Sequence, residues 1–308
     1  MKATLISCLL LFSTYLLAQP PAMLAVNNNL FADETEITIG DWYVFMYSVV
    51  NEDVDYGNND FAGSDFPSIS MMPDTSEMNP YFLFVFRNAS RGINTAYEGP
   101  NYKKKEIYSY RSKSGAWFVV PKEIPIHEDI WGFPVTGINF EQANAYVMWR
   151  NAKLQSDKKE KGKWLVRLPS VTEWESMARS AYELSVSKAK DQALKNDLKQ
   201  VYEGNGRNSK GCLLMNIIND NPCENDKKYM TKARGGIFPA YSFFPNQYGL
   251  YCMQGNVSEM TSEQGVAIGG NYQLTAADAR FNSKQEYKKP EVWLGFRCVA
   301  EMKKIRIN

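Results

Sequence analysis

The last third of this 308-residue chain restricts its fold more than any other part. From residue 205 onward the sequence is dense in Gly, Asn and Pro, and strands are only suggested. These residues favour turns and loops, so little regular structure is expected there. Hydrophobic residues make up 44% of the chain, which is enough for a proper core. The pattern predicts an irregular, loop-rich fold around that core.

Two helix starts are marked by capping boxes. In this motif one side chain caps a free backbone amide, and the side chain three residues later bonds back to the first residue. Asn139 with Gln142 is expected to begin one helix, and Ser170 with Glu173 another. Apolar residues at helical spacing follow both motifs, so each is expected to bury one face.

Other elements are expected from local patterns. A short strand should lead into a helix capped near Thr38, and apolar runs predict strands at residues 81–86 and 116–120. A third helix is expected near residues 182–201, where leucines and Val201 stand among lysines and acids, and we interpret it as a solvated insertion. Because no repeat or long linker divides the chain, residues 19–308 are expected to form one domain.

Residues 1–18 have the pattern of a secretory signal peptide. Lys2 supplies the positive charge, an apolar stretch runs from Leu5 to Leu17, and cleavage is expected after Ala18. The stretch is short for a membrane span, and an uncleaved anchor is the alternative. We therefore expect a secreted or periplasmic protein with no membrane span after cleavage.

Four cysteines follow the expected cleavage site: Cys212, Cys223, Cys252 and Cys298. An even number in an exported chain allows disulfides, and four cysteines permit three pairings. Cys212 and Cys223 bracket a short loop rich in Asn and Asp, so we favour a bridge between them. Such a bridge requires their Cα atoms to lie about 4.4–6.8 Å apart.

The charge balance excludes one class of partner. Lys and Arg number 35 against 34 acidic residues, whereas a nucleic-acid-binding protein would be expected to carry a basic excess. The single histidine, His127, argues against a histidine-bound zinc or iron site, because such sites normally take two or three imidazoles.

Several motifs occur in a fixed order along the chain: Glu34 to Thr38, Pro134 to Tyr146, Arg167 to Glu175, Tyr248 to Glu259, Gly269 to Tyr272, and Leu294 to Cys298. Together they resemble the formylglycine-generating-enzyme, or sulfatase-modifying-factor, family. The resemblance implies a single compact α+β domain of the C-type-lectin-like kind, with little regular structure.

Two arginines in these motifs also have a structural interpretation. Arg167 and Arg297 are expected to form buried, forked ion pairs with Glu173, Glu175 or Glu259. The sequence leaves the choice among these partners open.

The resemblance implies two calcium sites, the first of them within the Tyr248–Glu259 motif. Its ligands would be the side chain at position 252, the backbone carbonyls of Gly255 and Val257, and the carboxylate of Glu259. Position 252 is Cys252 here, and a thiol is a poor ligand for a hard cation that prefers oxygen. This site is expected to be weakened or empty.

The second implied calcium site would use Asn216 and Ile217 together with Asp226 and the carbonyl of Lys228. It keeps its oxygen ligands, so it is the better candidate for any bound calcium. A polar surface loop without an ion is the alternative interpretation.

The family's oxidases hold copper(I), a soft ion suited to sulfur, between two thiolates. The resemblance places these thiolate positions at Leu274 and Ala279, and neither side chain can bind a metal. No cysteine lies between Gly270 and Leu294. We therefore expect neither copper nor iron.

Two classes of function are compatible with this sequence. The first is a non-catalytic binding or scaffold component of the cell envelope or secretion machinery, with a protein or glycan partner. In its motifs and its expected export, the chain also resembles gliding-motility and type 9 secretion lipoproteins that carry this domain. The alternative is an oxidoreductase of altered chemistry that acts on a protein or peptide.

Overall fold

The computed structural model describes residues 23–50, 71–74, 76, 107–111, 117–121, 132–203, 205–219, 223, 225–227, 233 and 235–303. The signal peptide predicted at 1–18 and the strand predicted at 81–86 lie outside these residues. The elements in chain order are β1 (Met23–Ala25), β2 (Leu30–Asp33), α1 (Ile39–Val50), β3 (Ile107–Arg111), β4 (Trp117–Pro121), α3 (Phe140–Ser156), β5 (Trp164–Arg167), α4 (Val171–Lys188), α5 (Gln192–Tyr202), β6 (Ser258–Met260), β7 (Val266–Ile268), β8 (Lys284–Glu286), β9 (Leu294–Gly295) and β10 (Val299–Met302).

The strands form two small sheets and a hairpin. One sheet has the order β1-β2-β10-β5 and is antiparallel throughout. The other has the order β8-β7-β6-β9, with β6 and β9 parallel, and β3 pairs with β4. Because β2 from the start of the described chain pairs with β10 near its end, the two ends belong to one α+β domain.

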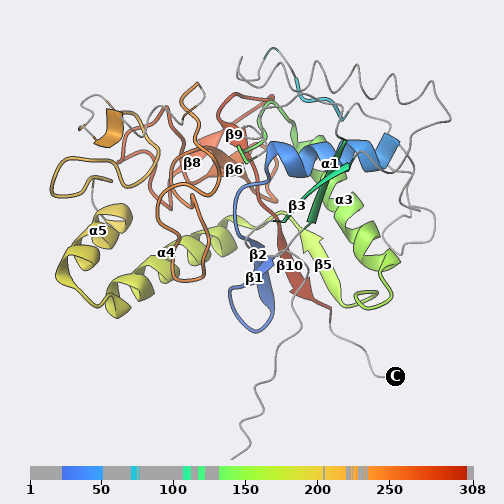
Figure 1. The fold of residues 1–308 in the computed structure, drawn as a ribbon, viewed down its shortest axis with the longest axis horizontal. Helices are drawn as coiled ribbons and strands as arrows, with labels where there is room; N and C mark the ends of the chain where they lie inside the picture. The colour runs from blue at the N-terminus through green and yellow to red at the C-terminus, as the bar shows by residue number, and fades with distance from the viewer. Residues whose placement is uncertain are drawn as a thin grey trace, which may run out of the picture.

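The helices lie on two sides of the central strands. Figure 1 shows α1 and α3 on one side of the β1-β2-β10-β5 sheet, and α4 and α5 on the other. Between β6 and β10 the chain is largely turns and loops, as the Gly, Asn and Pro content predicts.

The predicted helix starts are confirmed. Asn139 and Gln142 form a capping box at the start of α3, and Ser170 and Glu173 form another at the start of α4. At α1, the Oγ1 atom of Thr38 accepts a hydrogen bond from the amide of Asp41 at 3.2 Å. The strand expected at 116–120 is present as β4.

The single helix expected near residues 182–201 is instead two helices. α4 continues to Lys188, and α5 begins at Gln192 after Asp191, whose Oδ1 accepts the amide of Leu194 at 2.7 Å. The chain folds back so that α5 buries an apolar face against its surroundings, and the Tyr202 hydroxyl donates to Glu183 of α4 at 2.6 Å. A continuous helix would have left that face in solvent. Whether the segment is an insertion stays a prediction.

Aromatic side chains fill the core beside α1 and α3. Trp42 of α1 stacks on Tyr146 of α3 at 5.8 Å between ring centroids. Phe296, just after β9, meets both rings edge-on, at 6.1 and 5.5 Å. These ring contacts hold Phe296 in place, and they therefore also position the next residue, Arg297.

Candidate functional site

A fully buried ion pair lies where the two sheets approach each other. Arg297 and Glu259 both have 0% exposed side chains. Nε and Nη2 of Arg297 donate to the Glu259 carboxylate at 2.7–2.9 Å, and Trp174 Nε1 donates to the same group at 2.6 Å. The pairing expected for Arg297 is confirmed with Glu259 as the partner.

Arg297 also connects distant parts of the chain. Its Nη1 donates to the carbonyl of Asp33 at the end of β2, and its Nη2 donates to the carbonyl of Tyr251. Glu259 belongs to β6, so one guanidinium joins the β1-β2-β10-β5 sheet to the β8-β7-β6-β9 sheet. Each of its three nitrogens donates to an acceptor within the protein, which favours a structural role.

The pairing expected for Arg167 is confirmed with Glu173. The two guanidinium nitrogens lie 2.7 and 2.6 Å from the carboxylate oxygens. The bonds from Arg167 hold the pKa of Glu173 down at about 2. The side chains of this pair are 29% and 27% exposed, so the expectation that the pair is buried is wrong, unlike for the pair at Arg297.

A second buried carboxyl group, Glu36, lies beside the Arg297 pair. Its Oε1 accepts a hydrogen bond from Asn256 at 3.0 Å, whereas its Oε2 is buried without a partner. Burial raises the pKa of Glu36 to about 8, against the partial compensation of the Arg297 charge. The sequence motifs contained Glu36, but its placement next to a second carboxylate was not predicted.

The structure places the first implied calcium site inside this network. Both oxygens of Glu259 already accept hydrogen bonds from Arg297, and its charge is compensated there. Cys252 lies in a left-handed conformation (φ 50°), with its thiol donating to the carbonyl of Ser242 at 3.5 Å. A Cβ at Gly255 would overlap the carbonyl oxygen of Asn216, so the backbone is closely packed at this point. This donor set does not fit a calcium ion, because the only anionic ligand is committed to a guanidinium.

The residues of the second implied site have separate partners. Asp226 accepts the amides of Leu213 and Cys223 at 3.1 and 3.3 Å, and lies 3.9 Å from Arg207. The amide nitrogen of the Asn216 side chain donates to Gly236 and Asn256.

No hydrogen bond joins Asn216 to Asp226 in the described part of the chain. Ile217 is buried in an apolar cluster, and Lys228 lies outside the described residues. Oδ2 of Asp226 accepts hydrogen bonds from Leu213, Asn219 and Cys223. In the described part of the chain Oδ1 accepts only the amide of Leu213, so it is the oxygen with a lone pair left for a cation.

The two positions of the family thiolates lie in the loop after Gly270. Ala279 is 0% exposed, and a Cβ at Gly270 would overlap it. Leu274 packs against the same apolar cluster, which contains Trp174. Ala279 is therefore packed in the core and Leu274 is partly buried against it, and these two side chains offer no metal ligand.

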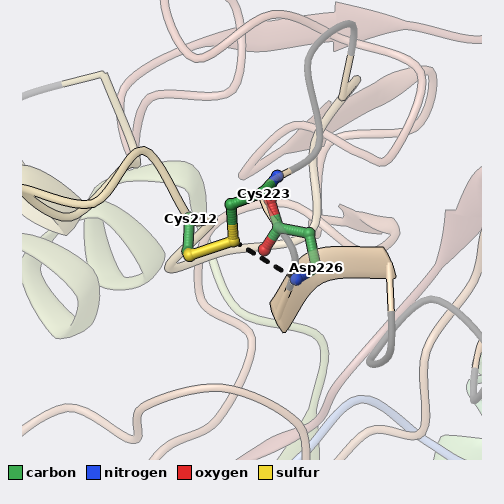
Figure 2. A group of neighbouring side chains, drawn as sticks. All are labelled: Cys212, Cys223 and Asp226. Atoms are coloured by element: carbon green, nitrogen blue, oxygen red, sulfur yellow. Dashed lines mark hydrogen bonds between the residues drawn. A yellow bond between two sulfur atoms is a disulfide. The ribbon is translucent and has the colours of Figure 1, made fainter.

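The expected disulfide between Cys212 and Cys223 is confirmed, with Cα atoms 5.2 Å apart. Figure 2 shows the carboxyl group of Asp226 beside the bridge. Cys252 and Cys298 are free and buried. Desolvation by burial raises the pKa of both of these thiols well above its ordinary value, so neither has the character of a reactive thiolate.

Removing the disulfide is expected to destabilise the protein by on the order of 2–3 kcal/mol, because it closes a short loop of the unfolded chain. The test compares urea unfolding of the wild type with that of the Cys212→Ser/Cys223→Ser variant. Equal midpoints would show that the bridge contributes nothing to stability.

A surface hollow of about 490 Å³ lies between α4 and the chain at Phe281. Arg179 lies over the Phe281 ring at 5.9 Å from its centroid, and Tyr202 stacks on the same ring at 5.5 Å. The lining is mixed, with hydroxyl, carboxylate, guanidinium and aromatic groups: Thr172, Glu175, Ser176, Arg179, Ser180, Glu183, Phe281 and Asn282. The sequence did not predict this hollow, although polar residues stand at helical spacing along α4.

The fold and the ordered motifs define a protein of the sulfatase-modifying-factor type. The chain matches the model of the sulfatase-modifying factor enzyme 1-like domain over residues 18–302, so it belongs to this family. No curated protein matches the sequence. In the described residues, no helix is long and apolar enough to cross a membrane.

Solved structures similar to this chain include the following three. They are the crystal structure of CarF (16% identity, TM-score 0.44, 89% of this chain and 87% of that chain), PvdO from Pseudomonas aeruginosa (17%, 0.37, 69% and 77%), and Treponema denticola variable protein 1 (16%, 0.31, 88% and 84%).

Proposed function

We propose that this chain is an exported, non-catalytic member of its family that acts as a binding or scaffold component of the cell envelope or secretion machinery. One observation carries the proposal: the loop after Gly270 has no cysteine, and Ala279, where the resemblance places a thiolate, is packed in the core. Without a thiolate pair the loop has no group that holds copper(I). The disulfide is compatible with export.

The hollow beside α4 is the surface that we assign to the partner. Its lining combines donors and acceptors with the Phe281 ring, which suits a polar segment of a protein or a glycan. Gln254 donates to the carbonyl of Ala279 at 3.4 Å, so the loop before Phe281 is anchored to the core and the hollow is largely preformed.

Crosslinking and affinity capture with the purified exported protein test this assignment. The partner recovered with wild-type protein should be lost with Arg179→Ala and Phe281→Ala, and kept with Lys159→Ala in the exposed turn after α3. Copper or iron in the purified protein, together with oxidation of a cysteine-containing peptide, would favour the oxidoreductase and contradict the proposal.

Export predicts cleavage after Ala18. N-terminal sequencing of protein recovered from periplasm or culture medium should begin at Gln19, because Lys2 and the apolar stretch form a signal peptide. Sequence beginning at Met1, with the protein retained in the cytoplasm, would contradict export.

We further propose at most one calcium ion per oxidised chain, bound through Asp226. Titration calorimetry of the wild type should show no more than one calcium site, because Glu259 of the other implied site is committed to Arg297. Asp226→Asn should abolish the remaining site. Two tight sites in the wild-type protein would refute this prediction.

A further inference from the structure

Three metal-ligating groups lie together beside the disulfide. The two sulfurs of Cys212 and Cys223 and a carboxylate oxygen of Asp226 all lie within 4.8 Å of one another. Cys212 and Asp226 are buried, and Cys223 is partly exposed. Figure 2 shows the Asp226 carboxyl group adjacent to the bridge. While the disulfide is intact the sulfurs are not thiolates, so the trio cannot bind a metal through them.

The trio is held in place by contacts that do not depend on the S–S bond. The Asp226 carboxylate accepts the amides of Leu213 and Cys223 at 3.1 and 3.3 Å and the side-chain amide of Asn219 at 3.2 Å. In return, the amide of Asp226 donates to the sulfur of Cys223 at 3.3 Å.

Cys212 is fixed independently of the bridge. Its amide donates to the Oδ1 atom of Asn208, and its carbonyl accepts the amide of Asn208, both at 2.9 Å. Breaking the bridge therefore leaves two thiols and a carboxylate close together, with little chain entropy left to lose on binding an ion.

We propose that the reduced chain binds one Zn²⁺ through Cys212, Cys223 and Asp226, with water as the fourth ligand. A dithiol reductant breaks the S–S bond and becomes a disulfide itself, supplying the two electrons and two protons that the sulfurs take up. Zinc then binds both sulfurs as thiolates and displaces those protons to solvent. Two thiolates select a borderline-soft ion such as zinc over calcium.

The surrounding charge suits this ion. Two thiolates and one carboxylate around Zn²⁺ leave one net negative charge. The Arg207 guanidinium lies 3.9 Å from Asp226 and donates to Asn219 at 2.9 Å, so it supplies the compensating positive charge beside the ligands. A neighbouring group of this kind also orients the ligating carboxylate. The three residues thus have two states, a disulfide and a zinc site.

The test measures zinc bound to the full chain before and after reduction. Protein reduced with a phosphine and desalted without oxygen should bind one zinc per chain by atomic spectrometry, and the oxidised protein should bind none. Substituted cobalt should show the charge-transfer absorption of thiolate ligands. Cys212→Ser and Asp226→Asn should each weaken zinc binding at least about tenfold, by loss of a ligand, whereas Cys252→Ser should leave it unchanged.

Zinc should also raise the melting temperature of the reduced protein, since it binds the folded state. Equal zinc affinity in reduced wild type and reduced Cys212→Ser would overturn the proposal. So would near-ultraviolet circular dichroism showing that reduction unfolds the chain and that zinc does not restore it.

Discussion

Replacing Arg297 with Met should destabilise the protein by about 3–5 kcal/mol, because Glu259 would keep a buried charge without a partner. Both side chains are 0% exposed, so water cannot take over the role of the guanidinium. The carbonyls of Asp33 and Tyr251 would also lose their donor. Urea unfolding at neutral pH measures the loss as a shift in midpoint at constant slope.

Two further variants identify the cause of that loss. Arg167→Met breaks an Arg–Glu pair of similar geometry whose side chains are 29% and 27% exposed, and it should cost at most about 1 kcal/mol. The double variant Arg297→Met/Glu259→Gln removes the orphaned charge and should regain part of the stability, since Trp174 can still donate to the amide oxygen. If Arg297→Met and Arg167→Met lowered the free energy of unfolding equally, burial would not be the cause of the larger loss expected at Arg297.

Glu36→Gln should make stability less dependent on pH. Burial raises the pKa of Glu36 from its ordinary 4.5 to about 8 in the folded protein. Between these values the folded chain keeps a proton that the unfolded chain has lost, so wild-type stability falls as the pH rises. One such proton contributes a slope of up to about 1.4 kcal/mol per pH unit.

The neutral amide introduced by Glu36→Gln mimics protonated Glu36, and its oxygen can still accept the bond from Asn256. The variant should therefore match the wild type near pH 4.5 and be more stable than it at pH 8. Urea unfolding across this range measures both slopes. Asp41 is half-buried, and desolvation raises its pKa to about 6, so some slope remains in both proteins at the lower end. Parallel curves for the two proteins would show that Glu36 ionises normally.

The sequence predicted those features that depend on neighbouring residues. The capping boxes at Asn139 and Ser170 bond within three residues, so their signal is local and both are confirmed. The same holds for Cys212 and Cys223, which lie 11 residues apart, and for Arg167, which finds its partner six residues away.

Long-range contacts were only partly predictable. Asn256 meets Glu36 across 220 positions of the chain, and no local pattern indicates that two carboxylates and one guanidinium share this interior. The break between α4 and α5 has a similar origin. Asp191 is a recognisable cap, but the gain from burying Leu198, Val201 and Tyr202 decides that the chain turns there.

The sequence alone therefore determined the family, the α+β class, the starts of α3 and α4 and the disulfide, because each depends on which residues stand within short motifs. The tertiary structure decided which oxygen atoms remain free for a ligand. Glu259 is engaged by Arg297, which lies 38 positions away, whereas one oxygen of Asp226 keeps a lone pair and its carboxylate lies beside two sulfurs. Two carboxylates of the same chemistry therefore differ in whether they can bind a ligand, because packing decides how far each is desolvated and which cation lies beside it.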